Sequence, residues 1–217
     1  TLEDHDISKE LEKSFQKRGV KVLTSAEVTS INTKGKGVKA TVKTKKGDEV
    51  ISADILLSAT GIKSNIEEIG LEEVGIKTEN GKLVVDEYYN TNVPGYYAIG
   101  DLLPTQALAH VASAEGIVCV EKIAGENPEP IDYGNIPGCT YCSPEIASVG
   151  LTESKAKEAG YDVKVGKFPF TASGKAQASG HSGGFVKVIF DEKYGEWLGC
   201  HMIGAGVTDM IAEAVLG

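Results

Sequence analysis

The chain has 217 residues, and 22 Lys and Arg against 31 Asp and Glu give it a formal net charge of −9. Its 41% hydrophobic and 24% charged residues are ordinary for a folded protein and exclude a long disordered chain. No apolar run approaches the roughly 20 residues that span a bilayer, and no basic cluster offers the patch that nucleic acid requires. We therefore expect a soluble protein that binds neither membrane nor nucleic acid.

The first residue is Thr1, and no apolar leader precedes the first predicted helix, so we expect a piece of a longer chain or a chain that has lost a tag. Four cysteines are too few and too irregularly spaced for a disulfide framework in a chain of this length. We expect a reducing, cytoplasmic location.

The first 60 residues predict one helix and a small antiparallel sheet. Ile7, Leu11 and Phe15 share one helical stripe, with Asp6 as the N-cap and Gly19 beyond the last turn. Residues 20–23 then read as a strand, and the alternating pattern of residues 28–51, broken by GKG and KKGDE, predicts a meander. The apolar run 53–61 resembles a buried strand that ends at a ligand crevice.

A glycine pattern within this meander invites comparison with a dinucleotide-binding loop. Gly35, Gly37 and Ala40 spell G-x-G-x-x-A, but a phosphate-binding loop must open a helix, and VKATVKT alternates as a strand does. A hairpin turn is the better interpretation. The later GAGVTD, 204–209, does join a strand to a helix, but Asp209 would repel a phosphate.

The middle of the chain places a carboxylate between a predicted strand and a predicted helix. LVVDE, 83–87, is one expected strand and residues 96–99 are another, of buried type. Asp101 follows at the end of that strand, and Pro104 is expected to open a helix that ends at Gly125. Asp101 could simply cap this helix, or it could accept a ligand hydroxyl while the free helix amides face a negative charge.

The stretch 125–138 is rich in Pro and Gly and predicts a linker before a second, α+β unit. This unit is expected to pack its helices on one face of an antiparallel sheet. Its predicted elements are a first strand, a helix at 152–159, strands within 161–168, 184–190 and 196–203, and a last helix from Val207.

Cys139 and Cys142 form a C-x-x-C that could be a redox pair or half of a zinc site. The four histidines are isolated, and no second C-x-x-C supplies further ligands. Residues three apart in a strand point to opposite faces, so we expect two spectator thiols and no metal. His201 is expected to line a sheet face.

Five segments in order resemble the C-terminal part of the flavin-dependent pyridine nucleotide-disulfide oxidoreductase family, and among its branches most closely the dihydrolipoamide dehydrogenases. The resemblance covers essentially the whole chain. The segments are ILLSATGIKSN, NTNVPGYYAIGD, QALAHVASAEG, YCSPEIASVGLTE and GAGVTDMIAEAVLG.

The resemblance implies an α/β plus α+β fold with three parts: residues 1–60 end an NAD-binding domain, 61–132 form a central FAD-domain segment, and 133–217 form a truncated interface domain. It implies a homodimer that pairs through residues 133–217. It further implies a parent enzyme that oxidises the dihydrolipoyl groups of 2-oxo acid dehydrogenase complexes through a redox disulfide and FAD, and reduces NAD⁺. Lipoyl domains would be its partners.

Matching motifs assign binding residues by resemblance. Asp101 would hold the flavin ribityl chain, and the backbone of Ala107, Leu108, Ala109 and His110 would lie against the flavin ring. Gly61 and, less directly, Val28 would line the nicotinamide nucleotide site.

The chain lacks the family's FAD and NAD fingerprints, its C-x-x-x-x-C pair and its C-terminal His and Glu. ATGIKSN also departs from A-x-G-R-x-P-N, and Cys142 stands where the family has Thr. With no redox-active cysteine pair to accept electrons, the isolated chain has no catalytic residues, is expected to be inactive and should bind FAD weakly or not at all. A sibling reductase of mercuric or glutathione type, an inactive dimerisation module and a zinc module are the alternatives.

Overall fold

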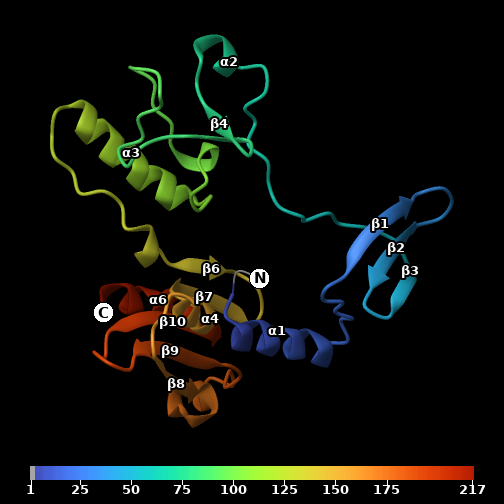
Figure 1. Ribbon diagram of the computed structural model, residues 1–217. Coiled ribbons are helices and arrows are strands. Elements are labelled where there is room, and N and C mark those ends of the chain that lie inside the picture. The colour runs from blue at the N-terminus through green and yellow to red at the C-terminus, as the bar shows by residue number, and fades with distance from the viewer. Residues whose placement is uncertain (1–2) are drawn as a thin grey trace. The chain divides into compact units, whose positions relative to one another are not determined.

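The computed structural model describes residues 3–217, which form two compact units. One unit is residues 5–61, and the other joins residues 3–4 to residues 62–217 (Figure 1). No helix within residues 3–217 has the length and apolar character needed to cross a bilayer.

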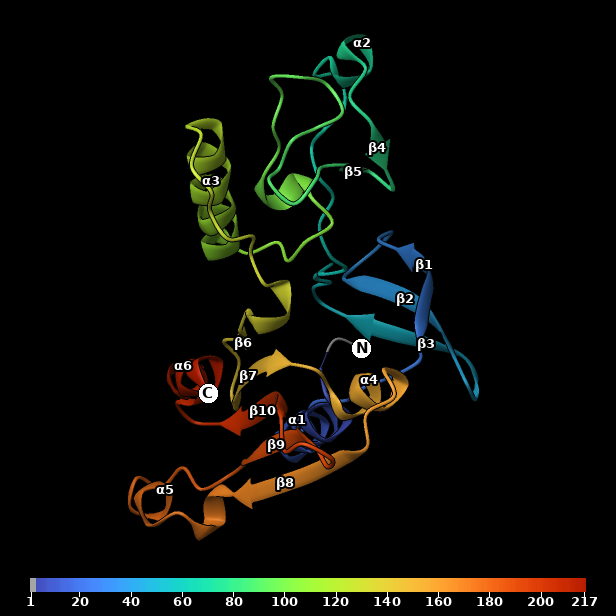
Figure 2. The same ribbon diagram turned by 60° about the vertical axis from the view of Figure 1, so that its left-hand side comes forward.

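The unit of residues 5–61 consists of one helix and an antiparallel meander, as the sequence predicts (Figure 2). Asp6 lies in the first helical turn rather than at the N-cap, because the helix begins at His5, two residues earlier than an N-cap at Asp6 implies. Gly35 and Gly37 both have positive φ in the turn between the first two strands, which confirms the hairpin interpretation. The elements are α1 (His5–Lys17), β1 (Glu27–Asn32), β2 (Val38–Thr44) and β3 (Gly47–Ala53).

Two predicted strands of this unit are wrong. Residues 20–23 and 55–61 have no regular secondary structure. Ile55 and Leu57 are 84% and 87% exposed, so the apolar run that suggested a buried strand is not buried. A strand needs a hydrogen-bonded neighbour, and within residues 3–217 none pairs with residues 55–61.

The segment that follows residue 61 packs around a small apolar core rather than a sheet. Its elements are α2 (Leu71–Val74), β4 (Thr78–Glu79), β5 (Lys82–Leu83), the single turn η1 (Gly100–Leu102) and α3 (Ala109–Ile123). The core residues are Ile76, Leu83, Tyr89, Ala98, Leu103 and Cys119.

Two expectations for this segment need correction. The strand expected at 83–87 is limited to Lys82–Leu83. Residues 96–99 form only one isolated bridge, Asn90 to Tyr97, and Ala98 is the buried member of that run. This apolar tetrapeptide thus contributes one residue, Ala98, to the core.

The second half of this unit is a five-stranded antiparallel sheet in the order β6-β7-β10-β9-β8. Its strands are β6 (Gly138–Thr140), β7 (Glu145–Gly150), β8 (Val163–Pro169), β9 (Phe185–Asp191) and β10 (Trp197–Gly204). Its helices are η2 (Tyr133–Asn135), α4 (Glu153–Glu158), η3 (Phe170–Ala172), α5 (Gly174–Ala178) and α6 (Val207–Leu216). The predicted strands and both predicted helices are present.

Helices cover both faces of this sheet, not one. Val207 and Ile211 of α6 pack with Cys200 and Met202 of β10. Ala156 of α4 packs instead with Ile189 and Leu198. Because side chains alternate along a strand, Ile189 and its neighbour Val188, which packs against the α6 cluster, lie on opposite faces.

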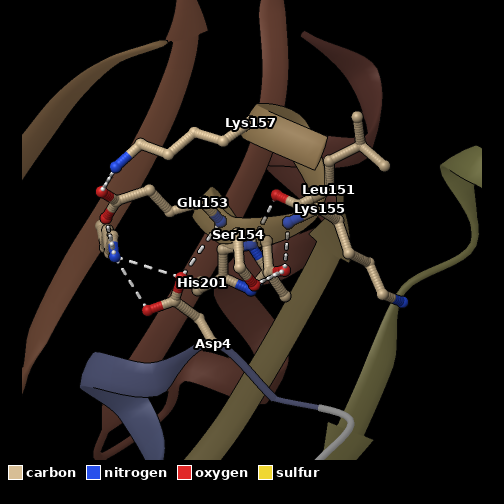
Figure 3. Close-up of polar contacts among 9 residues, drawn as sticks. Asp4, Leu151, Glu153, Ser154, Lys155, Lys157 and His201 are labelled. Atoms are coloured by element: carbon tan, nitrogen blue, oxygen red, sulfur yellow. Dashed lines mark hydrogen bonds and ion pairs between the residues drawn. The ribbon is translucent and has the colours of Figure 1, made fainter. Parts of the chain in front are cut away.

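The α4 face of the sheet contains a buried cation. Lys187 is 1% exposed, and its Nζ lies 2.9 and 3.1 Å from the two carboxylate oxygens of Asp4 and 2.7 Å from Glu153 Oε2. Asp4 also accepts the backbone N–H of Glu153 at 3.2 Å, and Lys157 donates to Glu153 Oε1 at 2.6 Å (Figure 3). A buried cation requires such compensation, so this cluster ties the start of the described chain to the sheet.

We predict that Lys187→Met lowers the free energy of unfolding by about 3–5 kcal/mol, because it leaves the buried Asp4 carboxylate without the cation that faces it. Urea denaturation followed by circular dichroism measures this. The control is Lys157→Met, since Lys157 is 57% exposed and an exposed pair contributes about 0–1 kcal/mol. Equal effects of the two substitutions would contradict the prediction.

The same cluster predicts a pH dependence. Hydrogen bonds from Lys157 and Lys187 hold the pKa of Glu153 below its usual value. A lowered native pKa stabilises the fold above the unfolded pKa, and this stabilisation is lost as pH falls through the native value. The destabilisation caused by Lys187→Met should therefore shrink in acid, when unfolding is compared at neutral pH and below the usual carboxyl range. A destabilisation that is constant with pH would contradict this.

Candidate functional site

The candidate site begins where α3 lies directly on the turn η1. Gly100 has φ +70°, and a Cβ added there would lie 3.1 Å from the Cβ of Ala112. A second glycine, Gly116, approaches Ile99 in the same way, at 3.3 Å. Two positions without side chains therefore let the helix pack closely against residues 99–101. Asp101 consequently lies beside the first half of α3.

The backbone of Asp101 is held while its side chain is exposed. Its carbonyl oxygen accepts hydrogen bonds from Ser64 Oγ at 2.6 Å and from Lys82 Nζ at 2.7 Å. Lys82 also donates to Ser64 Oγ at 2.8 Å, so the two donors support each other. The Asp101 carboxylate has no hydrogen bond to any residue in the range 3–217. It is therefore available to accept hydrogen bonds from the hydroxyl groups of a ligand.

The helix that follows begins later than predicted. Pro104 does not open it, because α3 starts at Ala109 with Leu108 as its N-cap and without a side-chain cap. In residues 104–108, Leu108 N–H bonds to Gln106 O at 2.8 Å, which belongs to a tight turn and not to a helix. The amides without intrahelical partners are thus those of residues 109–111, which overlap the predicted 107–110 segment and are not near Thr105.

The predicted flavin-contacting residues accordingly divide into two groups. Ala107 and Leu108 are extended, and Ala109 and His110 form the first turn of α3. Ala107 and Leu108 line a cavity of about 790 Å³, together with residues 104–106 and residues 148–151 of the sheet. Asp101 lies close to this segment in sequence but does not line the cavity.

Gly61 and Val28 belong to the unit of residues 5–61, whereas Asp101 belongs to the other unit. Gly61 has φ +111° and nothing within 4 Å of an added Cβ, and Val28 is 55% exposed in β1. Both are open to contact, and their assignment stays a prediction.

Sequence reasoning missed Ser64, Lys82 and Glu115, which hold the turn around Asp101. Glu115 accepts the backbone N–H of Gly100 at 2.5 Å. Ser64 and Lys82 lie 37 and 19 residues from Asp101. The one available signal was Glu115 itself, a charged residue within the apolar stripe of the predicted helix.

The C-x-x-C does not form a reactive pair. Cys139 and Cys142 are free thiols, and Cys142 donates to Pro144 O at 3.0 Å. Burial and then the nearby Glu145 carboxylate raise the pKa of both thiols. A thiol with a raised pKa is a weak nucleophile and a weak metal ligand. Among residues 3–217, no three His, Cys, Asp or Glu side chains are grouped to hold a metal ion.

Comparison with known proteins places the chain in a family. The signature of the pyridine nucleotide-disulphide oxidoreductases matches residues 1–116, and the signature of their dimerisation domain matches residues 136–217. This chain belongs to the pyridine nucleotide-disulphide oxidoreductase family. Its predicted fold class and resemblance are thereby confirmed, whereas the limits of its three predicted parts stay a prediction.

Curated relatives of the chain include dihydrolipoyl dehydrogenases. The chain is 53% identical to the dihydrolipoyl dehydrogenase of Rhizobium etli over 217 residues, which are 99% of this chain and 45% of that protein. It is 48% identical to the dihydrolipoyl dehydrogenase of Bacillus subtilis, over 99% of this chain and 46% of the relative. The chain thus spans less than half the length of the curated relatives that it matches.

Solved structures have the same fold. The crystal structure of LpdA from Mycobacterium tuberculosis aligns with a TM-score of 0.88 at 28% identity, over 100% of this chain and 47% of that one. The HOCl-induced flavoprotein disulfide reductase RclA from Escherichia coli aligns at 0.86 with 23% identity, over 99% of this chain and 49% of that one, which supports the fold alone.

The thiol environments give a prediction for this oxidoreductase segment. Burial raises the pKa of Cys200 to about 11, and this side chain is 0% exposed. We expect a thiol reagent at neutral pH to label Cys200 only after denaturation, and mild oxidation to leave Cys139 and Cys142 unlinked. Mass spectrometry of labelled peptides measures both. A Cys139–Cys142 disulfide in the folded protein would contradict the expectation.

Proposed function

We propose that this chain is the part of a dihydrolipoyl dehydrogenase that holds one side of the flavin and pairs two subunits. The observation that carries the proposal is the exposed Asp101 carboxylate, fixed through its backbone beside the start of α3. High identity to two dihydrolipoyl dehydrogenases supports that branch over a sibling reductase.

The residues fit FAD chemically. The Asp101 carboxylate would accept hydrogen bonds from ribityl hydroxyls, because ionised acceptors form the stronger hydrogen bonds. The amides at the beginning of α3 would face the pyrimidine end of the ring, where a helix N-terminus stabilises negative charge. When bound, the flavin carries electrons between a dithiol and the nicotinamide cofactor.

The remaining assignments follow the same proposal. Gly61 and Val28 would lie along the NAD nucleotide, and residues 133–217 would form the homodimer contact. The proposed partners are the lipoyl domains of 2-oxo acid dehydrogenase complexes. Free thiols with raised pKa values supply no electron acceptor, so we propose that this chain by itself does not turn over.

The test uses a chimera in which this chain replaces the aligned segment of the Rhizobium etli dihydrolipoyl dehydrogenase. We expect the chimera to bind FAD and to reduce NAD⁺ with dihydrolipoamide. The chain alone should give no dihydrolipoamide-dependent activity and little flavin absorbance. A folded chimera without flavin would overturn the proposal, and turnover by the isolated chain would refute the predicted inactivity.

Within that chimera, Asp101→Asn is expected to weaken FAD binding by about tenfold, since it replaces a charged acceptor with a neutral one. Flavin fluorescence during titration of the apoprotein measures the change. The matched control is Asp54→Asn, because Asp54 is exposed in the other unit and should leave the affinity unchanged. Equal affinities for the two variants would remove Asp101 from the site.

A further inference from the structure

Glu115 is a charged residue in a position that burial makes costly. It lies in the middle of α3 and is 0% exposed. A buried carboxylate costs several kcal/mol unless hydrogen bonds compensate it. Its neighbours therefore have to be donors, and the helix position must bring them within reach.

Three donors surround the Glu115 carboxylate. The backbone N–H of Gly100 donates to Oε2 at 2.5 Å. The hydroxyls of Thr105 and Tyr133 donate to Oε1 at 3.0 and 2.7 Å. Tyr133 also lies 3.1 Å from Tyr89 through the two hydroxyl oxygens. Each carboxylate oxygen is thus occupied, one by the turn before Asp101 and the other by two side chains.

The positions of these donors let the Glu115 carboxylate hold the backbone on both sides of Asp101. Gly100 precedes Asp101 directly, and Thr105 lies between Asp101 and the start of α3. Glu115 therefore fixes both ends of residues 100–105. Ser64 and Lys82 hold the Asp101 carbonyl, so the backbone on both sides of the exposed carboxylate is constrained.

Tyr133 adds a link to the sheet half of this unit. Burial, then its hydrogen bonds to Tyr89 and Glu115, raise the pKa of its hydroxyl. The hydroxyl therefore stays protonated and donates across the accessible pH range. Because Tyr133 opens η2, the Glu115 carboxylate joins the Asp101 turn to the segment just before the dimerisation domain, which begins at residue 136.

We propose that Glu115 is a positioning residue for the flavin site: its reach to the Gly100 N–H sets the direction of the Asp101 carboxylate. This inference rests on the proposed function and adds to it a residue that does not contact the flavin. The length of the side chain is the decisive property, because a backbone N–H has a fixed place and a carboxylate one methylene shorter cannot meet it.

Two conservative substitutions separate reach from charge. Glu115→Gln keeps the reach, and its amide oxygen can accept from Gly100 while its NH₂ donates to the hydroxyls of Thr105 and Tyr133. Glu115→Asp keeps the charge and loses the reach. In the chimera we expect Glu115→Gln to bind FAD within about threefold of the parent, and Glu115→Asp to bind at least about tenfold more weakly.

A second measurement needs no flavin. In the isolated chain labelled with ¹⁵N-glycine, the short charge-assisted bond should place the Gly100 amide proton downfield. Glu115→Asp should move it upfield and speed its hydrogen exchange, while the exposed control Glu126→Asp should not. A purely structural role would lower the melting temperature without this pattern of Gln tolerance and Asp sensitivity.

The two measurements also distinguish the two proposals. If the parent chimera binds no flavin, the proposed function fails, and the Gly100 amide still tests the bond. If the chimera binds flavin and Glu115→Asp binds as tightly as the parent, the positioning role is overturned. An unmoved Gly100 amide in Glu115→Asp overturns it as well. If Glu115→Asp fails to fold, Glu115→Gln decides instead, because it keeps the reach to the Gly100 N–H: a folded Glu115→Gln that binds FAD at least about tenfold more weakly than the parent overturns the role.

Discussion

Direct packing of α3 on Gly100 is the constraint on which the candidate site depends. Gly100 has a positive φ and no room for a side chain against Ala112, so the helix axis lies closer to the turn than any other residue would permit. Only at that distance does Glu115, one helical turn beyond Ala112, reach the Gly100 N–H. Because the backbone bonds are satisfied internally, the Asp101 carboxylate is left exposed. The lack of a side chain at Gly100 thus leaves the carboxylate of the next residue, Asp101, free to contact a ligand.

The two faces of the five-stranded sheet are stabilised in different ways, because one is apolar and the other contains buried polar groups. The α6 face is apolar and supports the fold by hydrophobic burial. The α4 face holds Lys187 opposite His201 in adjacent strands, and both are buried. His201 Nε2 bonds to Leu151 O at 2.9 Å. Buried polar groups need partners at hydrogen-bonding distance and angle. This face therefore fixes the position of residues 3–4 more specifically than an apolar contact would.

The sequence alone was enough to predict an element where its residue pattern and its packing partners both lie in the same stretch of chain. The stripe of Ile7, Leu11 and Phe15 predicts α1, and the alternation in residues 184–190 predicts β9. It was insufficient at residues 55–61, because an apolar run specifies burial but does not supply a neighbouring strand. At Asp101 the motif identified the exposed carboxylate, whereas its supports came from residues 64, 82 and 115. Such long-range pairs have no local periodicity and become visible only in three dimensions.

Holding a cofactor and carrying out its chemistry make different demands, and under the proposed function this chain would meet only the first. A holding site needs fixed acceptors and free amides, and in the proposed function Asp101 and the start of α3 would provide them. Electron transfer through sulfur needs an exposed thiolate of lowered pKa, but burial and Glu145 raise the pKa of Cys139 and Cys142. The electrostatics of these thiols favour the protonated form that a structural cysteine retains. Membership in a family of disulphide oxidoreductases therefore does not make every cysteine pair in the chain a redox centre.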